Sequence, residues 1–476
     1  MFRLHNTIRD YAWGSATALA ELTGRVPTGR PEAELWIGAH PGAPSRVELP
    51  VAAAPAGIAD RDTPSGPDGI AGPDEVSGSP RMPGLDELLA ATPELLGEDA
   101  VRRFGGLPFL TKLLAAAAPL SLQVHPSSDR ARAGFAAEER AGIPRSAPHR
   151  NYKDEHHKPE LLLALTPFRA LCGFREPAAS AALFEALAAS PVLGGDAAGA
   201  ARDIAGLLHD GDIAAAFTAL LGGERREIAP ALAALVREAP AAVADRMASR
   251  PEADLDDGLR EIVSIGQHYP GDPGTLVSLL LNHVTLEPGE AIALPAGNVH
   301  AYLDGLGVEV MASSDNVLRG GLTPKHVDVV ELLATVDFRP LPVPRVRPEP
   351  AVPGSAADPR SSVYRPGFEE FQLQRLHWPA PGTPTRADAP TGDAVAVEAN
   401  GPVAILVTEG SVRFESPAGS VLLQPGEAAF VPAGETPVSA RPEAFPGGEA
   451  PGNADAGRDG GATAFAVTLP PRAPRP

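Results

Sequence analysis

Two patterns of hydrophobic positions alternate along the chain, one typical of short strands and the other of helices. Short apolar runs bounded by Gly and Pro predict buried strands, and they include the stretches 107–126, 157–174 and 276–333. Further short strands are predicted within 1–48 and after the linker at 341–362. Between the stretches 157–174 and 276–333, residues 176–266 carry apolar side chains at helical spacing, as at Leu232, Leu235 and Val236. The pattern therefore predicts strands interrupted by a helical block.

A motif occurs twice, and its repetition suggests the type of sheet. The two copies are LEPGEAIALPAGNVHAY at 286–302 and LQPGEAAFVPAGETPVS at 423–439. Each copy reads as a turn, a short strand and a second turn, which is typical of the small jelly rolls called cupins. When the copies are aligned on PAG, His300 of the first lies opposite Pro437 of the second. Only the first copy therefore keeps a side chain that can bind a metal at this position.

These patterns predict a mainly β fold with a helical insertion, made of two cupin or jelly-roll domains and one α-helical domain. The predicted domains are a metal-binding cupin formed by 1–175 and 267–340, a helical domain at 176–266, and a C-terminal cupin-like domain without metal ligands at 341–476. Residues 51–83 are rich in Gly, Pro, Asp and Ser and show no periodicity. Such a composition predicts a flexible surface insertion.

The charge and cysteine content narrow the classes of partner. A net charge of −20 would repel nucleic acid and anionic membranes, so we expect neither as a partner. An anionic substrate would need a local basic pocket. The single cysteine, Cys172, excludes an intramolecular disulfide, which suits a protein of the reducing cytoplasm. We expect Cys172 to be a small buried side chain. The pattern shows neither a signal peptide nor a membrane span, so we expect a cytoplasmic protein. We expect a monomer, with an oligomer left open by the sequence.

Polar side chains recur at alternate positions in three of the predicted strands. Alternate residues of a strand face the same side, so the members of each set would point together. The three sets are Ser121, Gln123 and His125; Lys158 and Glu160; and His300 and Tyr302. An amide oxygen, two imidazoles and a carboxylate suit Zn²⁺, with Mn²⁺, Fe²⁺ and Co²⁺ as alternatives. A histidine in an apolar strand is more often a core or surface group, so the pattern alone leaves this site open.

Longer motifs resemble the type I mannose-6-phosphate isomerases. They are SLQVHPSS, HKPELLLALTPFRALCGF and LPAGNVHAYLDGLGVEVMASSDNVLRGGLTPKHVD, together with YAWGS and ELWIGAHPGAPS. The resemblance implies a zinc enzyme that interconverts mannose 6-phosphate and fructose 6-phosphate and so supplies mannose metabolism and GDP-mannose precursors. It implies one zinc ion per chain, bound by Gln123, His125, Glu160 and His300. It also places the active-site arginine of the family at Arg319.

Aldose–ketose isomerisation moves a proton between C1 and C2 through an enediol, which suggests roles for further residues. Lys158 is the expected proton carrier, because a lysine near a dication loses its proton more easily. Arg319 either neutralises the enediolate or binds the phosphate, and a salt bridge with Asp315 is the purely structural alternative. The other predicted substrate and phosphate contacts are Ser121, Lys112, Lys325 and Tyr302. A metal-dependent cupin oxygenase and a non-catalytic sugar-phosphate sensor are the competing functions.

Two groups of side chains near these motifs receive a structural interpretation. His156 and His157 precede the strand of Glu160 and are expected at the surface or behind the ligands. Four aromatic or acidic residues among the first 40 positions are expected to pack beneath the site, and they are Tyr11, Trp13, Glu34 and Trp36.

Overall fold

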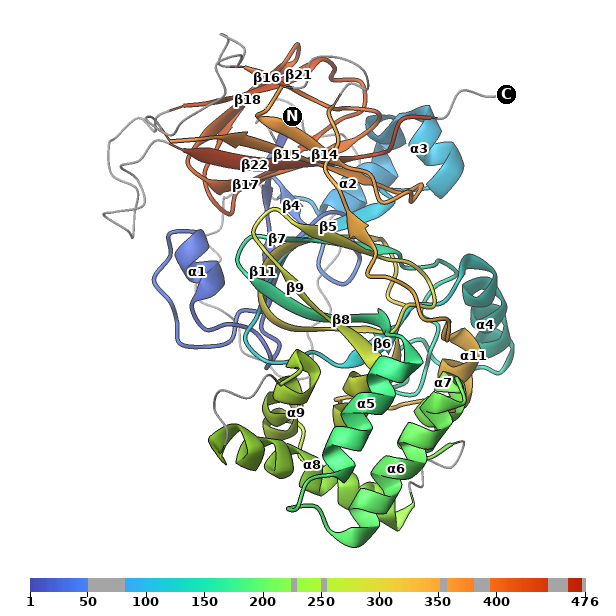
Figure 1. Cartoon of the computed structure of the whole chain (residues 1–476). Coiled ribbons are helices and arrows are strands. Elements are labelled where there is room, and N and C mark those ends of the chain that lie inside the picture. The colour runs from blue at the N-terminus through green and yellow to red at the C-terminus, as the bar shows by residue number, and fades with distance from the viewer. Residues whose placement is uncertain are drawn as a thin grey trace.

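The computed structural model describes seven stretches of the chain, which are residues 1–49, 82–223, 229–249, 255–351, 358–380, 394–443 and 461–472. The predicted insertion at 51–83 lies outside these residues except for its last two positions. The strands gather in the upper and middle parts of the molecule and the helices α5 to α9 at its lower end (Figure 1).

The largest sheet among the described residues is antiparallel and occupies the middle of the molecule. Its main path runs through β13 (Arg345–Val346), β10 (Ala291–Leu294), β7 (Glu160–Ala164), β11 (His300–Ala312), β5 (Phe109–Ala116), β3 (Glu34–Ile37) and β2 (Thr7–Arg9). Four further strands pair with this path or with one another: β6 (Leu122–Val124), β8 (Phe168–Phe174), β9 (Leu281–Leu286) and β12 (Leu318–Gly321). The long strand β11 pairs with β5, β6, β7 and β8, so it joins most of the sheet.

Two further antiparallel sheets lie in the upper part and contain the C-terminal strands. The first runs in the order β14 (Ser361–Tyr364), β15 (Gln372–Trp378), β22 (Ala462–Thr468), β17 (Val403–Glu409), β20 (Ala428–Val431), β1 (Phe2–His5) and β4 (Arg46–Val47). The second contains β16 (Val395–Val397), β21 (Val438–Pro442), β18 (Val412–Ser416) and β19 (Gly419–Leu423). The N-terminal strand β1 thus lies in a sheet made mainly of C-terminal strands.

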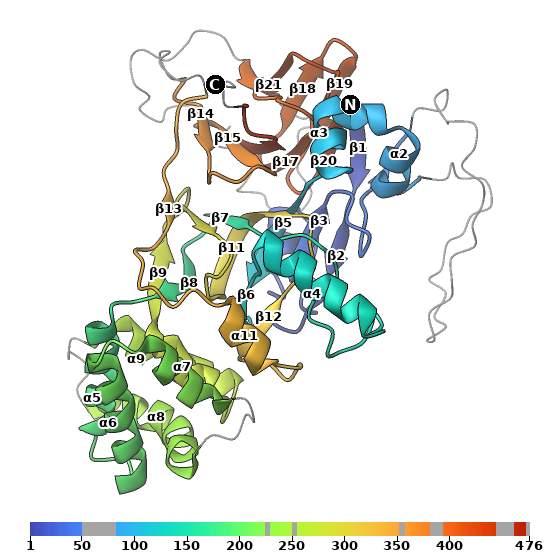
Figure 2. The same cartoon turned by 90° about the vertical axis from the view of Figure 1, so that its right-hand side faces the viewer.

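Helices cover one end of the large sheet and also flank the upper sheets. The lower group comprises α5 (Pro177–Ala188), α6 (Gly195–His209), α7 (Ile213–Leu221), α8 (Pro230–Ser249), α9 (Asp257–His268) and the short α10 (Gly274–Val277). Its apolar faces share one buried cluster with β6 and β8. The other helices are α1 (Ala18–Leu22), α2 (Leu85–Ala91), α3 (Gly97–Phe104), α4 (Ser128–Arg140) and α11 (Val329–Thr335). Figure 2 shows the lower group at the end of the molecule opposite to the C-terminal sheets.

The fold therefore mixes helices and strands, whereas the sequence predicted a mainly β protein. Helix α4 shows why the helical share was underestimated. Its sequence SDRARAGFAAEER buries only Ala131 and Phe135, so it lacks a broad apolar stripe. The helix is instead fixed at its start by Ser127, whose side chain accepts a hydrogen bond from the backbone N–H of Arg130.

The two copies of the repeated motif form the same local structure. In each copy a glycine with positive φ makes the turn, at Gly289 with φ 90° and at Gly426 with φ 82°. Glycine suits this conformation because a side chain would clash there. A strand of four residues follows each turn, β10 in the first copy and β20 in the second.

The upper and middle sheets share one hydrophobic core. Leu161 and Val308 of the middle sheet belong to the same buried cluster as Phe371 and Phe430, which come from the upper part. All four side chains are fully buried. Burying apolar surface between the sheets stabilises their association, so the two parts are held together over a wide apolar interface.

A half-buried histidine near α9 makes stability depend on pH. The ring nitrogen Nε2 of His283, on β9, is buried without a hydrogen-bond partner among the described residues. Burial and the nearby Arg175 lower the pKa of His283 to about 4, although Asp256 opposes this. The unfolded chain, with a pKa near 6.5, then binds more protons between pH 4 and 6.5. Stability from this group is complete above pH 6.5 and is lost as the pH falls toward 4.

We therefore expect the protein to lose about 2 kcal/mol of stability between pH 7 and pH 5 through His283 alone. A His283→Gln variant has no titrating group at this position, so its loss over the same interval should be smaller by that amount. Urea denaturation of both proteins at the two pH values measures the difference. Parallel pH profiles for the two proteins would show that His283 titrates normally in the folded state.

Candidate metal centre and active site

Three of the predicted ligands converge at the centre of the large sheet. His125 follows β6, Glu160 begins β7, and His300 begins β11. Glu160 Oε1 lies 3.2 Å from His125 Nε2, and Glu160 Oε2 lies 3.2 Å from His300 Nε2. All three side chains are almost completely buried. Within the part of the chain that the structure describes, this is the one group of three or more His, Cys, Asp or Glu side chains whose ligand atoms all lie within 4.8 Å of one another.

The hydrogen bonds of the two imidazoles leave their Nε2 atoms free to bind a metal. His125 Nδ1 lies 2.8 Å from the backbone carbonyl oxygen of Asn316, and His300 Nδ1 lies 3.0 Å from that of Asn298. A carbonyl oxygen only accepts, so each Nδ1 carries the proton and each Nε2 presents a lone pair. Burial lowers the pKa of His125 to about 4, although the Glu160 carboxylate opposes this.

The unshared electron pairs of the three ligand atoms point toward one another and fit a bound cation. His125 Nε2, His300 Nε2 and Glu160 Oε2 are buried, and none has a hydrogen-bond partner among the described residues. Three acceptors that face one another repel, and buried polar groups without partners are costly. Nitrogen and carboxylate ligands of this kind fit a divalent metal ion such as zinc.

Gln123 lies next to this group in the sheet. It is the register partner of His300 on β11 and of Arg319 on β12. Gln123 also lines the cavity beside the metal group. Its position is compatible with the predicted role as a ligand, which stays a prediction.

A cavity of about 530 Å³ opens beside the three converging side chains. Its size falls within the range of small-molecule sites. The predicted site residues on its wall are Ser121, Gln123, Lys158, Glu160, Tyr302, Lys112, Arg319 and Lys325. Tyr11, Trp13, Glu34 and Trp36, which were expected to pack beneath the site, also line the cavity. His268 and Tyr269, at the end of α9, add a part of the wall that sequence reasoning did not foresee.

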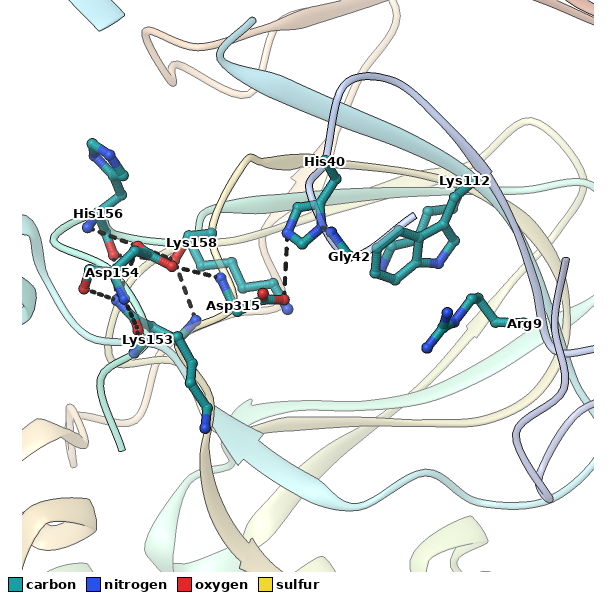
Figure 3. Close-up of polar contacts among 12 residues, drawn as sticks. Arg9, His40, Gly42, Lys112, Lys153, Asp154, His156, Lys158 and Asp315 are labelled. Atoms are coloured by element: carbon teal, nitrogen blue, oxygen red, sulfur yellow. Dashed lines mark hydrogen bonds and ion pairs between the residues drawn. The ribbon is translucent and has the colours of Figure 1, made fainter. Parts of the chain in front are cut away.

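Lys158 joins the cavity to the metal group. Its Nζ lies 3.2 Å from Glu160 Oε1, and its side chain is buried. Figure 3 shows Lys158 beside Asp315, which lies between Lys158 and His40. The lysine predicted as proton carrier is thus placed within reach of both the metal group and the cavity.

Lys112 and Tyr302 share a buried carboxylate that the sequence analysis overlooked. Glu309 Oε2 accepts a hydrogen bond from Lys112 Nζ at 2.8 Å, and Glu309 Oε1 accepts one from the Tyr302 hydroxyl at 2.9 Å. Burial favours the neutral amine, but Glu309 and Glu34 raise the pKa of Lys112 above its usual value. The positive charge of Lys112 is therefore already compensated. A signal was available, because Glu309 is a lone carboxylate in the apolar run LGVEVMA.

Two further side chains, Asn316 and Asp315, shape the site through contacts that were not predicted. Asn316 accepts hydrogen bonds through Oδ1 from the backbone N–H groups of Lys153 and Asp154, at 2.7 Å and 3.3 Å. Asp315 Oδ1 lies 3.4 Å from His40 Nε2, as the dashed line in Figure 3 marks. Asn316 acts through backbone groups and Asp315 through His40, so residue type and spacing give no signal for them.

Arg319 and Lys325 supply positive charge to the cavity. Arg319 is half-buried and forms no hydrogen bond or ion pair with the described residues that would fix its guanidinium group. Burial lowers its pKa, and Asp315, the alternative partner considered from the sequence, contacts His40 instead. Lys325 is exposed at the rim. The cavity of this acidic protein therefore contains a basic side that could bind an anion.

The two histidines before β7 lie outside the metal group. His156 is exposed. His157 Nε2 lies 2.7 Å from Glu370 Oε1, a carboxylate of the segment before β15. Neither belongs to the three converging side chains, in agreement with the sequence analysis.

Among the described residues, no helix is both long and apolar enough to cross a membrane.

Comparisons with known proteins agree with one another. The family model described as phosphomannose isomerase type I, catalytic domain, matches residues 1–53 and 74–177. The mannose-6-phosphate isomerase of Escherichia coli (strain K12) is 37% identical over 445 residues, which cover 93% of this chain and 97% of that protein. The mannose-6-phosphate isomerase of Rattus norvegicus is 30% identical over 453 residues, covering 92% and 94%.

Solved structures of the same enzyme share the fold. A variant of phosphomannose isomerase from Salmonella typhimurium superposes with a TM-score of 0.76 at 31% identity, covering 98% of this chain and 99% of that chain. A mannose 6-phosphate isomerase bound with zinc and yttrium superposes with a TM-score of 0.74 at 31% identity, covering 98% and 100%. Because these relatives match over nearly the whole length of both chains, the chain belongs to the type I mannose-6-phosphate isomerase family of aldose–ketose isomerases.

Proposed function

We propose that this isomerase binds one Zn²⁺ and interconverts D-mannose 6-phosphate and D-fructose 6-phosphate by proton transfer through an enediol. The observation that supports this most directly is the set of three buried acceptor atoms on His125, Glu160 and His300, beside a cavity with a basic side. Gln123 would complete the ligands. Zinc bound there would supply positive charge that stabilises the negative charge developing on the sugar oxygens.

The side chains on the cavity wall would carry out the proton transfer and hold the substrate. Lys158, beside Glu160, is placed to move the proton between C1 and C2. Arg319 can neutralise the enediolate oxygen, because no carboxylate among the described residues competes for its guanidinium group. Lys325 at the rim and Ser121 would bind the phosphate. Lys112 and Tyr302 remain predicted substrate contacts, although both already bind Glu309.

The same proposal covers the architecture. The middle sheet and the upper sheets would correspond to two cupin domains, with the metal only in the first, where the repeat has His300 in place of Pro437. The domains would span 1–175 with 267–340, 176–266, and 341–476. We propose that the enzyme acts in the cytoplasm as a monomer and supplies mannose metabolism and GDP-mannose precursors.

A chelation experiment tests the proposed function. Fructose 6-phosphate release from mannose 6-phosphate, followed in a coupled assay, should be lost after treatment with EDTA and removal of the chelator. Zinc added at one equivalent per chain should restore it, because the described part of the chain contains one group of converging ligands. Elemental analysis of the same samples gives the zinc content independently of activity. Full activity in zinc-free protein would contradict the metal-dependent mechanism.

A further inference from the structure

The segment that carries Lys158 is held from the C-terminal part of the chain. His157 Nε2 donates a hydrogen bond to Glu370 Oε1 at 2.7 Å. Glu370 lies in the connection between β14 and β15, which belong to the upper sheet, whereas His157 precedes β7 of the middle sheet. Figures 1 and 2 both show β14 and β15 above β7. This contact therefore links the C-terminal sheet to the segment on which the reactive lysine lies.

Among the described residues, His157 is the one side chain that contacts the Glu370 carboxylate, and the backbone N–H groups of Glu369 and Glu370 also favour its charged form. The Glu370 side chain is 12% exposed, and its other oxygen, Oε2, is buried without a hydrogen-bond partner among the described residues. The next residue, Phe371, is fully buried in the core that also contains Leu161 and Leu163 of β7. The connection is thus anchored in the shared core, and Glu370 extends from a fixed point toward His157.

The backbone on both sides of His157 and Lys158 is fixed as well. The carbonyl oxygen of His156 accepts hydrogen bonds from Asn316 Nδ2 at 2.8 Å and from Ser314 Oγ at 3.2 Å. The carbonyl oxygen of Pro159 accepts one from the backbone N–H of Ala312 at 3.0 Å. Between these two points, side chains make the contacts of the segment with the other described residues, and they are His157 with Glu370 and Lys158 with Glu160.

We propose that Glu370 is a positioning residue for the isomerase reaction, which acts through His157 to hold Lys158 in the cavity. The inference rests on the proposed function, because it uses Lys158 as the proton carrier. In an extended segment that leads into a strand, neighbouring side chains point to opposite sides. Fixing His157 on the side of the C-terminal sheet therefore directs Lys158 toward the cavity and Glu160. This gives the C-terminal part of the chain a role in catalysis although none of the proposed metal ligands lies there.

The test compares two neighbouring carboxylates. Glu370→Ala removes the contact with His157, and Glu369→Ala removes a carboxylate that is 81% exposed and contacts Arg103 instead. We expect Glu370→Ala to lower kcat on mannose 6-phosphate by roughly 10–100-fold, because small displacements of a reacting group are costly. KM and zinc content should change little, and Glu369→Ala should resemble the parent protein. Equal kcat values for the parent and Glu370→Ala would overturn the proposal.

Two further variants separate positioning from loss of fold. Glu370→Gln keeps a carbonyl oxygen that can accept from His157, so it should restore most of the parent kcat. His157→Ala removes the same contact from the other side and should reproduce the loss of kcat. The double variant with Glu370→Ala should lose no more than either single variant. In a Lys158→Ala background, Glu370→Ala should cause no further loss. An additional loss in that background would show that Glu370 does not act through Lys158.

Chemical labelling of Lys158 tests the positioning role of Glu370 independently of the proposed isomerase activity. If the parent protein releases no fructose 6-phosphate, the proposed function fails. The placement of Lys158 is then judged from its rate of acetylation by acetic anhydride, quantified by mass spectrometry. A rate that changes in Glu370→Ala and stays at the parent value in Glu369→Ala supports the positioning contact. The same rate in all three proteins contradicts it.

Discussion

Replacing His300 by alanine is expected to remove zinc and to lower kcat/KM by at least roughly 10³-fold, while the protein stays folded. His300 supplies one of the three converging ligand atoms, and its Nε2 is buried without another partner among the described residues. Without it, a site with two protein nitrogens becomes a site with one. The metal would then be held mainly by His125 and Glu160, with Gln123 as the remaining predicted ligand.

Elemental analysis and circular dichroism measure the two parts of this expectation separately. A matched control is His209→Ala, because His209 is exposed on α6, where it contacts Glu185 far along the chain from the cavity residues. This control should retain one zinc ion per chain and the parent activity. Full zinc occupancy in folded His300→Ala protein would remove His300 from the ligand set.

The second large effect is expected at Arg319, where substitution separates catalysis from substrate capture. Arg319 lies opposite Gln123 in the sheet, next to the metal group, and is half-buried. If its guanidinium group meets the enediolate, the contact strengthens only in the transition state. Arg319→Ala should then lower kcat by roughly 10²–10³-fold with little change in KM.

Lys325 provides the comparison, because it lies on the same cavity but is exposed at the rim. If Lys325 binds the phosphate in the ground state and the transition state alike, Lys325→Ala should mainly raise KM. Steady-state kinetics of both variants on mannose 6-phosphate, after checks of zinc content and fold, decide between the roles. A near-parental kcat with a large rise in KM for Arg319→Ala would move this residue to the phosphate site. Unchanged kinetics in Arg319→Ala would show that Arg319 has only a structural role.

The convergence of three side chains could be predicted from the sequence, whereas the share of helix in the fold could not. His125, Glu160 and His300 lie at strand ends, where alternation and a recognisable motif both point to them, and the structure brings them together. Cys172 is fully buried, as predicted. The helical share was underestimated because α4 depends on a capping side chain and buries only two residues. Local caps leave a weaker mark on hydrophobic periodicity than a buried face does.

Residues that act through other residues could not be found from the sequence. Asn298 and Asn316 orient the two imidazoles through backbone carbonyl oxygens, a role that any residue could fill. Glu370 meets His157 across 213 positions of the chain. Such contacts depend on how the sheets pack, which neither the period nor the spacing of residues encodes.

The place of β1 in the upper sheet also bears on how the chain folds during its synthesis. Phe2 of β1 pairs with Phe430 of β20, and Met1 and Glu435, which form an ion pair beside them, are 434 positions apart. A ribosome that adds about 5–20 residues per second needs roughly 20–90 s to cover that distance. During this time β1 can pair with β4, but its other edge lacks the partner it has in the finished sheet. Unpaired strand edges attract other chains, so nascent or truncated chains that end before β20 are the forms of this protein most exposed to aggregation.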